Sequence, residues 1–170
     1  MPRKMLFAIA ALAIAAPASA DWQYSRWGMS PEEVLAANPA LRAGEDPENS
    51  IAASLVRVSG LHREGGRDFI VRFGFDAANR LNTVYVHPSD PRHCRGMVGA
   101  VESRLGRGIR GTQIPNVLDI RTWQDPRAGN QLQLFVIGRM RRPESCSIRY
   151  HPPGGPGEPP STAAKPASEI

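Results

Sequence analysis

Apolar and polar residues alternate most regularly in the middle of the chain, between residues 69 and 87. In residues 69–75 the large apolar side chains occupy every second position, which places them on one face of a β-strand: Phe69, Val71, Phe73 and Phe75. Residues 76–80 contain Asp and Asn, which favour turns. Residues 81–87 then resume a β-branched and aromatic run. The pattern predicts a β-hairpin with one apolar face that the rest of the domain has to cover.

A short helix is signalled shortly after residue 29. Ser30 is a favoured cap, Pro31 suits the first helical position, and Glu33 completes a capping box. Asn38 precedes Pro39, and the residue before a proline disfavours helical backbone, so the helix ends there. The helix has only about two turns and therefore depends on packing for its stability.

A longer helix follows the hairpin. Asp90 or Ser89 caps it and Pro91 takes the first position. Its apolar residues recur at three- and four-residue spacing and form one stripe: Cys94, Met97, Val98, Val101 and Leu105. Gly106 or Gly108 ends it.

Further segments have the composition of strands, namely residues 51–58, 117–123, 131–137 and 145–150, while residues 21–29 are predicted to form a short strand or an extended entry. Residues 39–49 and 106–111 are predicted loops, and residues 138–144 a basic turn. The elements predict an α+β domain over residues 21–150, with an antiparallel β-sheet and two helices packed on one face. Their order suggests two α-plus-hairpin halves.

Both ends of the chain differ from this domain. Residues 1–20 combine a basic start, a short apolar run and an Ala-Ser-Ala ending, which predicts a cleaved signal peptide. A retained membrane anchor is the alternative, although the apolar run is too short to span a bilayer. Residues 151–170 are rich in Pro and Gly and contain almost no large apolar residue, so they are predicted to be a disordered tail.

The chain has two cysteines, Cys94 and Cys146. In an exported protein an even number of cysteines predicts a disulfide, and two separate buried thiols are the alternative. The bond would tie the second helix to the last strand. Together with the signal peptide, it predicts a periplasmic or secreted protein with no integral membrane segment after cleavage.

The formal net charge is +5, and removal of Arg3 and Lys4 with the signal peptide leaves +3. The densest basic cluster is Arg139, Arg141 and Arg142, beside Pro143. Three arginines in a loop can contact phosphates or carboxylates, and a solvated turn is the alternative. The few aromatic residues fall in predicted strands, which argues against stacking on nucleic acid bases.

Candidate chemistry is sparse. Residues 106–111 match the dinucleotide-binding glycine spacing, but they follow a helix instead of a strand. His87 and His93 lie near the start of the second helix, and a metal-dependent or hydrolytic site there is the alternative function. No serine lies in a Gly-x-Ser-x-Gly elbow. The sequence therefore predicts a protein without catalytic activity or cofactor.

Three short motifs carry a family resemblance: residues 27–34, the hairpin around Phe73 and Phe75, and the helix from Cys94 to Gly106. They resemble small exported proteobacterial proteins without assigned activity. More distantly, they are similar to outer-membrane assembly lipoproteins of the small protein A type and to the β-lactamase-inhibitor-protein fold. This chain lacks the lipobox cysteine of the lipoproteins.

The resemblance implies a binding or scaffolding domain. The predicted function is a non-enzymatic, exported binding or envelope-accessory protein. Its expected partner is an envelope protein or an anionic envelope component, and the binding residues would be the arginine cluster or an exposed sheet face. A secreted protein with a purely structural role is a further possibility.

Overall fold

The structure is a computed structural model that describes residues 21–51, 54–125, 127–139 and 141–154. The predicted signal peptide, and all but the first four residues of the predicted tail, lie outside the described residues. In the part of the chain that is described, no helix has the length and apolar character needed to cross a membrane.

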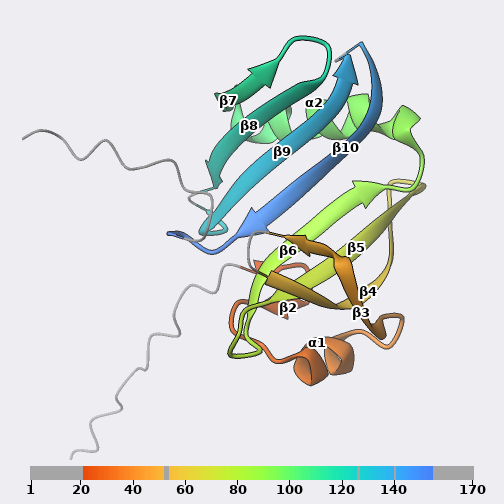
Figure 1. The fold of residues 1–170 in the computed structure, drawn as a ribbon, viewed down its shortest axis with the longest axis vertical. Coiled ribbons are helices and arrows are strands. Elements are labelled where there is room, and N and C mark those ends of the chain that lie inside the picture. Colours follow the sequence, from red (N-terminus) through yellow and green to blue (C-terminus); the bar gives the residue numbers. More distant parts are fainter. Residues whose placement is uncertain (1–20, 52–53, 126, 140, 155–170) are drawn as a thin grey trace, which may run out of the picture.

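Eight strands form one antiparallel sheet in the order β3-β4-β5-β6-β10-β9-β8-β7 (Figure 1). The strands are β3 (Arg42–Ile51), β4 (Ser54–Glu64), β5 (Arg67–Phe75), β6 (Leu81–Pro88), β7 (Ile109–Ile114), β8 (Leu118–Asp125), β9 (Asn130–Arg139) and β10 (Arg142–His151). This order consists of two four-stranded meanders, which meet where β6 pairs with β10. An antiparallel sheet with two helices is confirmed. Each half has four strands, however, and not the single hairpin that the sequence suggested.

A helix precedes each meander. The first is α1 (Pro31–Ala37); the second is α2 (Cys94–Leu105), which directly follows the 3-10 turn η1 (Pro91–His93). The predicted capping box is present, since the Ser30 side chain accepts from the Glu33 N–H at 3.3 Å and the Glu33 carboxylate accepts from the Ser30 N–H at 2.8 Å. A small hairpin of β1 (Asp21–Trp22) and β2 (Ser25–Arg26) stands in front of α1 in the sequence.

The buried apolar side chains form two clusters, one in each half. The first contains Val34 of α1 and the second contains Met97 of α2. Phe69 and Tyr150 pack against both clusters and join them. The strand positions in the clusters pair directly across the sheet, as in Val71 with Val86, Val86 with Ile148, and Ile148 with Leu134. Directly paired residues point to the same side, so both clusters lie on one face of the sheet, here called the core face.

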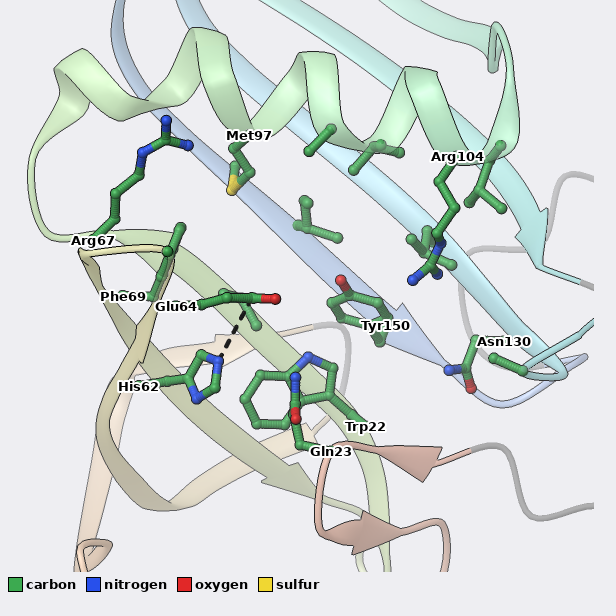
Figure 2. A pocket seen from close by; sticks show the side chains of 18 of the residues that line it. Trp22, Gln23, His62, Glu64, Arg67, Phe69, Met97, Arg104, Asn130 and Tyr150 are labelled. Atoms are coloured by element: carbon green, nitrogen blue, oxygen red, sulfur yellow. Dashed lines mark ion pairs between the residues drawn. The ribbon is translucent and has the colours of Figure 1, made fainter.

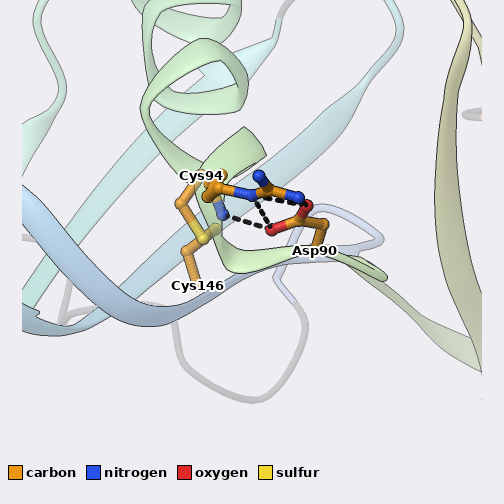
Figure 3. Close-up of a disulfide and its surroundings, with 4 residues drawn as sticks. Asp90, Cys94 and Cys146 are labelled. Atoms are coloured by element: carbon orange, nitrogen blue, oxygen red, sulfur yellow. Dashed lines mark hydrogen bonds and ion pairs between the residues drawn. A yellow bond between two sulfur atoms is a disulfide. The ribbon is translucent and has the colours of Figure 1, made fainter.

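The predicted disulfide between Cys94 and Cys146 is present and joins the first residue of α2 to β10 (Figure 3). Cys94 is fully buried, and the two Cα atoms are 5.6 Å apart. Next to it, Asp90 caps η1 and accepts from the Arg92 side chain. This hydrogen bond, with help from the Arg92 N–H, lowers the pKa of Asp90 to about 2.

Two predicted loops are wrong. Much of the stretch 39–49 belongs to β3, an edge strand that pairs with β4. The stretch 106–111 ends the helix at Gly106 as predicted, but β7 begins at Ile109. Both strands lie at the edges of the sheet, where pairing with one neighbour stabilises segments that lack a strong apolar alternation.

Two further boundaries differ. The predicted basic turn is much shorter, because Arg139 ends β9 and Arg142 begins β10, directly opposite it. β10 also includes His151, which is 1% exposed, so the ordered domain runs one residue into the predicted tail.

Candidate functional site

The core face is not fully covered. Between the two halves lies a cleft of about 520 Å³, bounded by α2 on one side and by the β1–β2 hairpin and the β4–β5 turn on the other (Figure 2). Pockets of this volume accommodate small molecules. The cleft is the candidate functional site.

The floor of the cleft is apolar. It consists of Val86 from β6, Ile148 and Tyr150 from β10, and Leu132 from β9. The register places these four together, since Val86 pairs with Ile148 and Tyr150 pairs with Leu132. The central seam between the two meanders therefore forms the floor.

The first wall is built around Trp22 of β1, which is buried. Its ring packs edge-on against Phe73 at 5.9 Å and against His62 at 5.3 Å between ring centroids. The His62 Nε2 also lies 3.6 Å from the Glu64 Oε2, an ion-pair distance when the imidazole is protonated. Trp22 thus anchors the N-terminal hairpin in the first half, and His62 and Glu64 of β4 line the cleft beside it.

The second wall is α2. Gly96, Ala100 and Arg104 line the cleft at four-residue spacing, beside Met97 and Val101. Residues four apart lie on one face of a helix, and the two small residues leave the space that a larger side chain would occupy. The small residues Gly96 and Ala100 therefore help to create the cleft.

Two arginines stand at opposite ends of the α2 wall. Arg67, the first residue of β5, reaches to α2 (Figure 2), where its Nη1 lies 3.1 Å from the position a Cβ atom would take on Gly96. The Arg67 side chain forms no ion pair or hydrogen bond with another described residue. Arg104 points down from α2 and forms an ion pair with Asp125, whose side chain is 5% exposed. Gly96 and Arg104 are eight positions apart, which corresponds to about 12 Å along the helix.

Tyr150 points its hydroxyl into the cleft between these ends (Figure 2). Burial raises the pKa of Tyr150; the positive charge of Arg104 and a side-chain hydrogen bond with Trp22 oppose this rise. The hydroxyl is therefore protonated at neutral pH and serves as a neutral hydrogen-bonding group. The arrangement provides an apolar floor, one neutral hydroxyl and one unpaired cation.

The arginines predicted from the sequence lie elsewhere. Arg139, Arg141 and Arg142 are exposed at the tip of the β9–β10 hairpin, and none of them lines the cleft. Arg139 instead lines a second hollow of about 340 Å³, together with Arg110 and Ile114 at the β7 edge. The structure therefore brings Arg139 next to a strand that the sequence did not predict.

The two predicted metal-site histidines have different partners. The His87 Nε2 lies 3.2 Å from Arg72, and burial followed by the Arg72 charge lowers the pKa of His87. His93 ends η1, beside Cys94, which the disulfide occupies. Among the residues that the structure describes, no group of three or more His, Cys, Asp or Glu side chains is arranged to hold a metal ion.

Sequence reasoning missed the cleft because its residues come from several elements. Trp22, Arg67 and Tyr150 were assigned to an entry segment, a turn and the last strand. One signal was present in the second predicted helix, where Gly96 and Ala100 are small and Arg104 follows on the same side. Two small residues and an arginine on one face of a helix, next to its apolar stripe, indicate that this face leaves space beside the helix.

Comparisons with protein-family models, with curated proteins and with solved structures found no match for this chain. The resemblance to exported binding and scaffolding domains therefore stays a prediction.

Proposed function

We propose that this protein is a non-enzymatic binding protein of the cell envelope, and that its cleft holds a small amphiphile with one anionic group. The observation that carries the proposal is Arg67, an unpaired guanidinium above an apolar floor. An apolar body would cover the floor, and a carboxylate or phosphate would pair with Arg67.

Binding is favoured over catalysis by the state of the charged groups around Tyr150. The buried Asp125 is paired with Arg104, while Glu64 is largely exposed and lies beside His62. A buried carboxylate held by an arginine, as Asp125 is, is suited to fixing the wall of the cleft. A general base needs a lone pair available to the substrate.

Export is supported by the Cys94–Cys146 disulfide, because such bonds persist in oxidising compartments. The same proposal places both helices on the core face. Its support is that Val34 of α1 and Met97 of α2 belong to clusters whose strand residues share that face.

The test uses three ligands that share a ten-carbon chain and differ in the head group: decanoate, decanol and decylamine. Isothermal titration calorimetry on the purified protein should show tightest binding for decanoate. Arg67→Gln should weaken decanoate about tenfold, since hydrogen bonds to charged groups contribute about 1.5–3 kcal/mol, reduced here by solvent at an exposed arginine. The affinity for decanol should not change.

Two controls distinguish the cleft from the general surface. Arg95→Gln removes an exposed arginine of α2 that does not line the cleft, and it should leave all three affinities unchanged. Ala100→Trp should fill the cleft and abolish binding, whereas Ser103→Trp on the exposed side of the same helix should not. Equal affinity for decanoate and decylamine, or binding that survives Ala100→Trp, would contradict the proposal.

A further inference from the structure

The β7 edge of the sheet has features of a second binding site, separate from the cleft. β7 pairs with β8 and is the last strand in the sheet order, so among the described strands nothing pairs with its outer edge. All six of its residues are exposed. An edge strand leaves half of its backbone N–H and C=O groups without a sheet partner, and another chain can bind to them.

The register assigns the β7 side chains to opposite faces. Arg110 pairs with Arg121, which pairs with Leu134, so Arg110 lies on the core face. Ile114 pairs with Leu118, which pairs with Ile137, so these residues lie on the other face, here called the outer face.

Ile109 lies on the outer face as well, because it pairs with Thr122, four residues from Leu118. Ile109 and Ile114 are five positions apart, an odd spacing that would place them on opposite faces of a regular strand. They share a face because a register shift between Arg110 and Gln113 adds one residue to β7.

The outer face next to this edge is apolar. Three of the five exposed large hydrophobic residues in the described chain lie here: Ile109 is 70% exposed, Ile114 48% and Ile137 46%. Ile120 and Phe135 pair directly with each other on the same face and extend the patch inward. A cluster of exposed aliphatic side chains on a monomer commonly marks an interaction site.

The charge beside this patch is positive. Arg107, Arg110 and Arg139 form no ion pair with any described residue, and Arg110 and Arg139 line the same hollow. Glu102 and Asp119, the acidic side chains that line hollows together with Arg110, are both bound to Arg121. An acidic partner would therefore find unpaired guanidinium groups at this edge.

We propose that β7 binds an extended protein segment that adds to the sheet as a ninth strand. The segment has apolar residues at every second position, which pack beside Ile109 and Ile114 on the outer face. Its alternate residues are acidic and meet Arg110 on the core face. A second copy of this chain fits less well, because pairing two β7 strands would bring their arginines together.

The probe is a fluorescein-labelled octapeptide of alternating valine and glutamate, and a second octapeptide has lysine in place of glutamate. Fluorescence anisotropy with the purified, disulfide-bonded protein should detect binding of the glutamate peptide only. Ile109→Asp and Arg110→Glu should each weaken this binding at least tenfold, and Arg110→Glu should improve binding of the lysine peptide. Hydrogen exchange should slow in residues 109–114 when the glutamate peptide binds.

Matched controls are available in the other half and on α2. Leu61→Asp introduces the same charge at a position that is 65% exposed, and Arg95→Glu reverses an exposed arginine away from β7; neither should change the affinity. All four positions are exposed, so the variants should fold, which circular dichroism can check.

Three outcomes would overturn the proposal. The first is equal binding of both peptides, and the second is an equal loss of affinity in the control variants. The third is self-association of the protein alone that Ile109→Asp abolishes, because it would assign the edge to a second copy of the chain.

Discussion

Removing the Cys94–Cys146 bond should lower the free energy of unfolding by about 4 kcal/mol. The two cysteines are 52 residues apart, and in the chain-entropy model the closure of a loop of this length in the unfolded state gives that magnitude. Both side chains are buried, so the variant with alanine at both positions adds no unsatisfied polar group. In the chain-entropy model the bond acts on the unfolded chain.

The location of the bond makes the prediction sharper. The closed loop contains α2, β7, β8 and β9, and both cysteines belong to the core cluster of the second half. In the Cys94→Ala/Cys146→Ala variant, amide hydrogen exchange should accelerate more in β8 and β9 than in β4 and β5.

Urea unfolding followed by circular dichroism measures the free energy, and with a slope of about 2 kcal/mol per molar urea the midpoint should fall by about 2 M. Wild-type protein under reducing conditions provides the comparison that leaves the sequence intact. The reasoning is refuted if both samples lose less than about 1 kcal/mol, or if exchange accelerates equally in the two halves.

Three further predictions concern single residues. His151 is 1% exposed, and burial lowers its pKa to about 4. As the pH falls, the unfolded chain therefore takes up a proton at this residue near pH 6.5, before the folded protein does. The free energy of unfolding should fall by about 3 kcal/mol between pH 6.5 and pH 4. Urea unfolding at several pH values should show this slope in the wild type and a smaller one in His151→Gln. Gly108→Ala should lower the free energy of unfolding by about 1–3 kcal/mol, because the new methyl group would lie 2.5 Å from the buried Trp123 ring. Gly111→Ala is the control: its nearest neighbour is at 3.5 Å, so it should cost less than about 1 kcal/mol. Thermal unfolding of both variants measures the difference. Trp27→Phe removes the hydrogen bond that the indole N–H donates to Asn130 at 3.0 Å. The free energy of unfolding should fall by about 1–2 kcal/mol. An unchanged unfolding midpoint would contradict this prediction.

Elements with strong local signals could be predicted from the sequence. The capping box at Ser30, the apolar stripe of α2 and the alternation around Phe73 each depend on residues within a few positions of one another, and all three are present in the structure. The disulfide was predictable as well, because two cysteines allow only one intramolecular pairing.

The edge strands could not be predicted in the same way. β7 contains a register shift that places Ile109 and Ile114 on one face at a five-residue separation, so the period of two is interrupted. β3 pairs with β4 through a polar sequence that reads as a loop by itself. In both cases the neighbouring strand supplies the stabilisation, and a local pattern does not contain that information.

The cleft could not be predicted from the sequence for a related reason. Arg67 and Gly96 approach each other from different halves of the molecule, and Tyr150 lies far from both in the chain. Local periodicity places each residue on an element but does not state which elements meet. The sheet order, with β6 beside β10, is the fact that assembles the site.

That sheet order also constrains how the nascent chain folds. The first meander is complete once β6 has been synthesised, but the strand that pairs with the open side of β6 is β10, the last strand of the chain. During synthesis the β6 edge, with the apolar Val84 and Val86 beside it, remains available to other molecules until the final residues of the domain arrive. A chain shortened before residue 142 would keep this edge open permanently and should aggregate, although its first half contains every residue of its own core cluster.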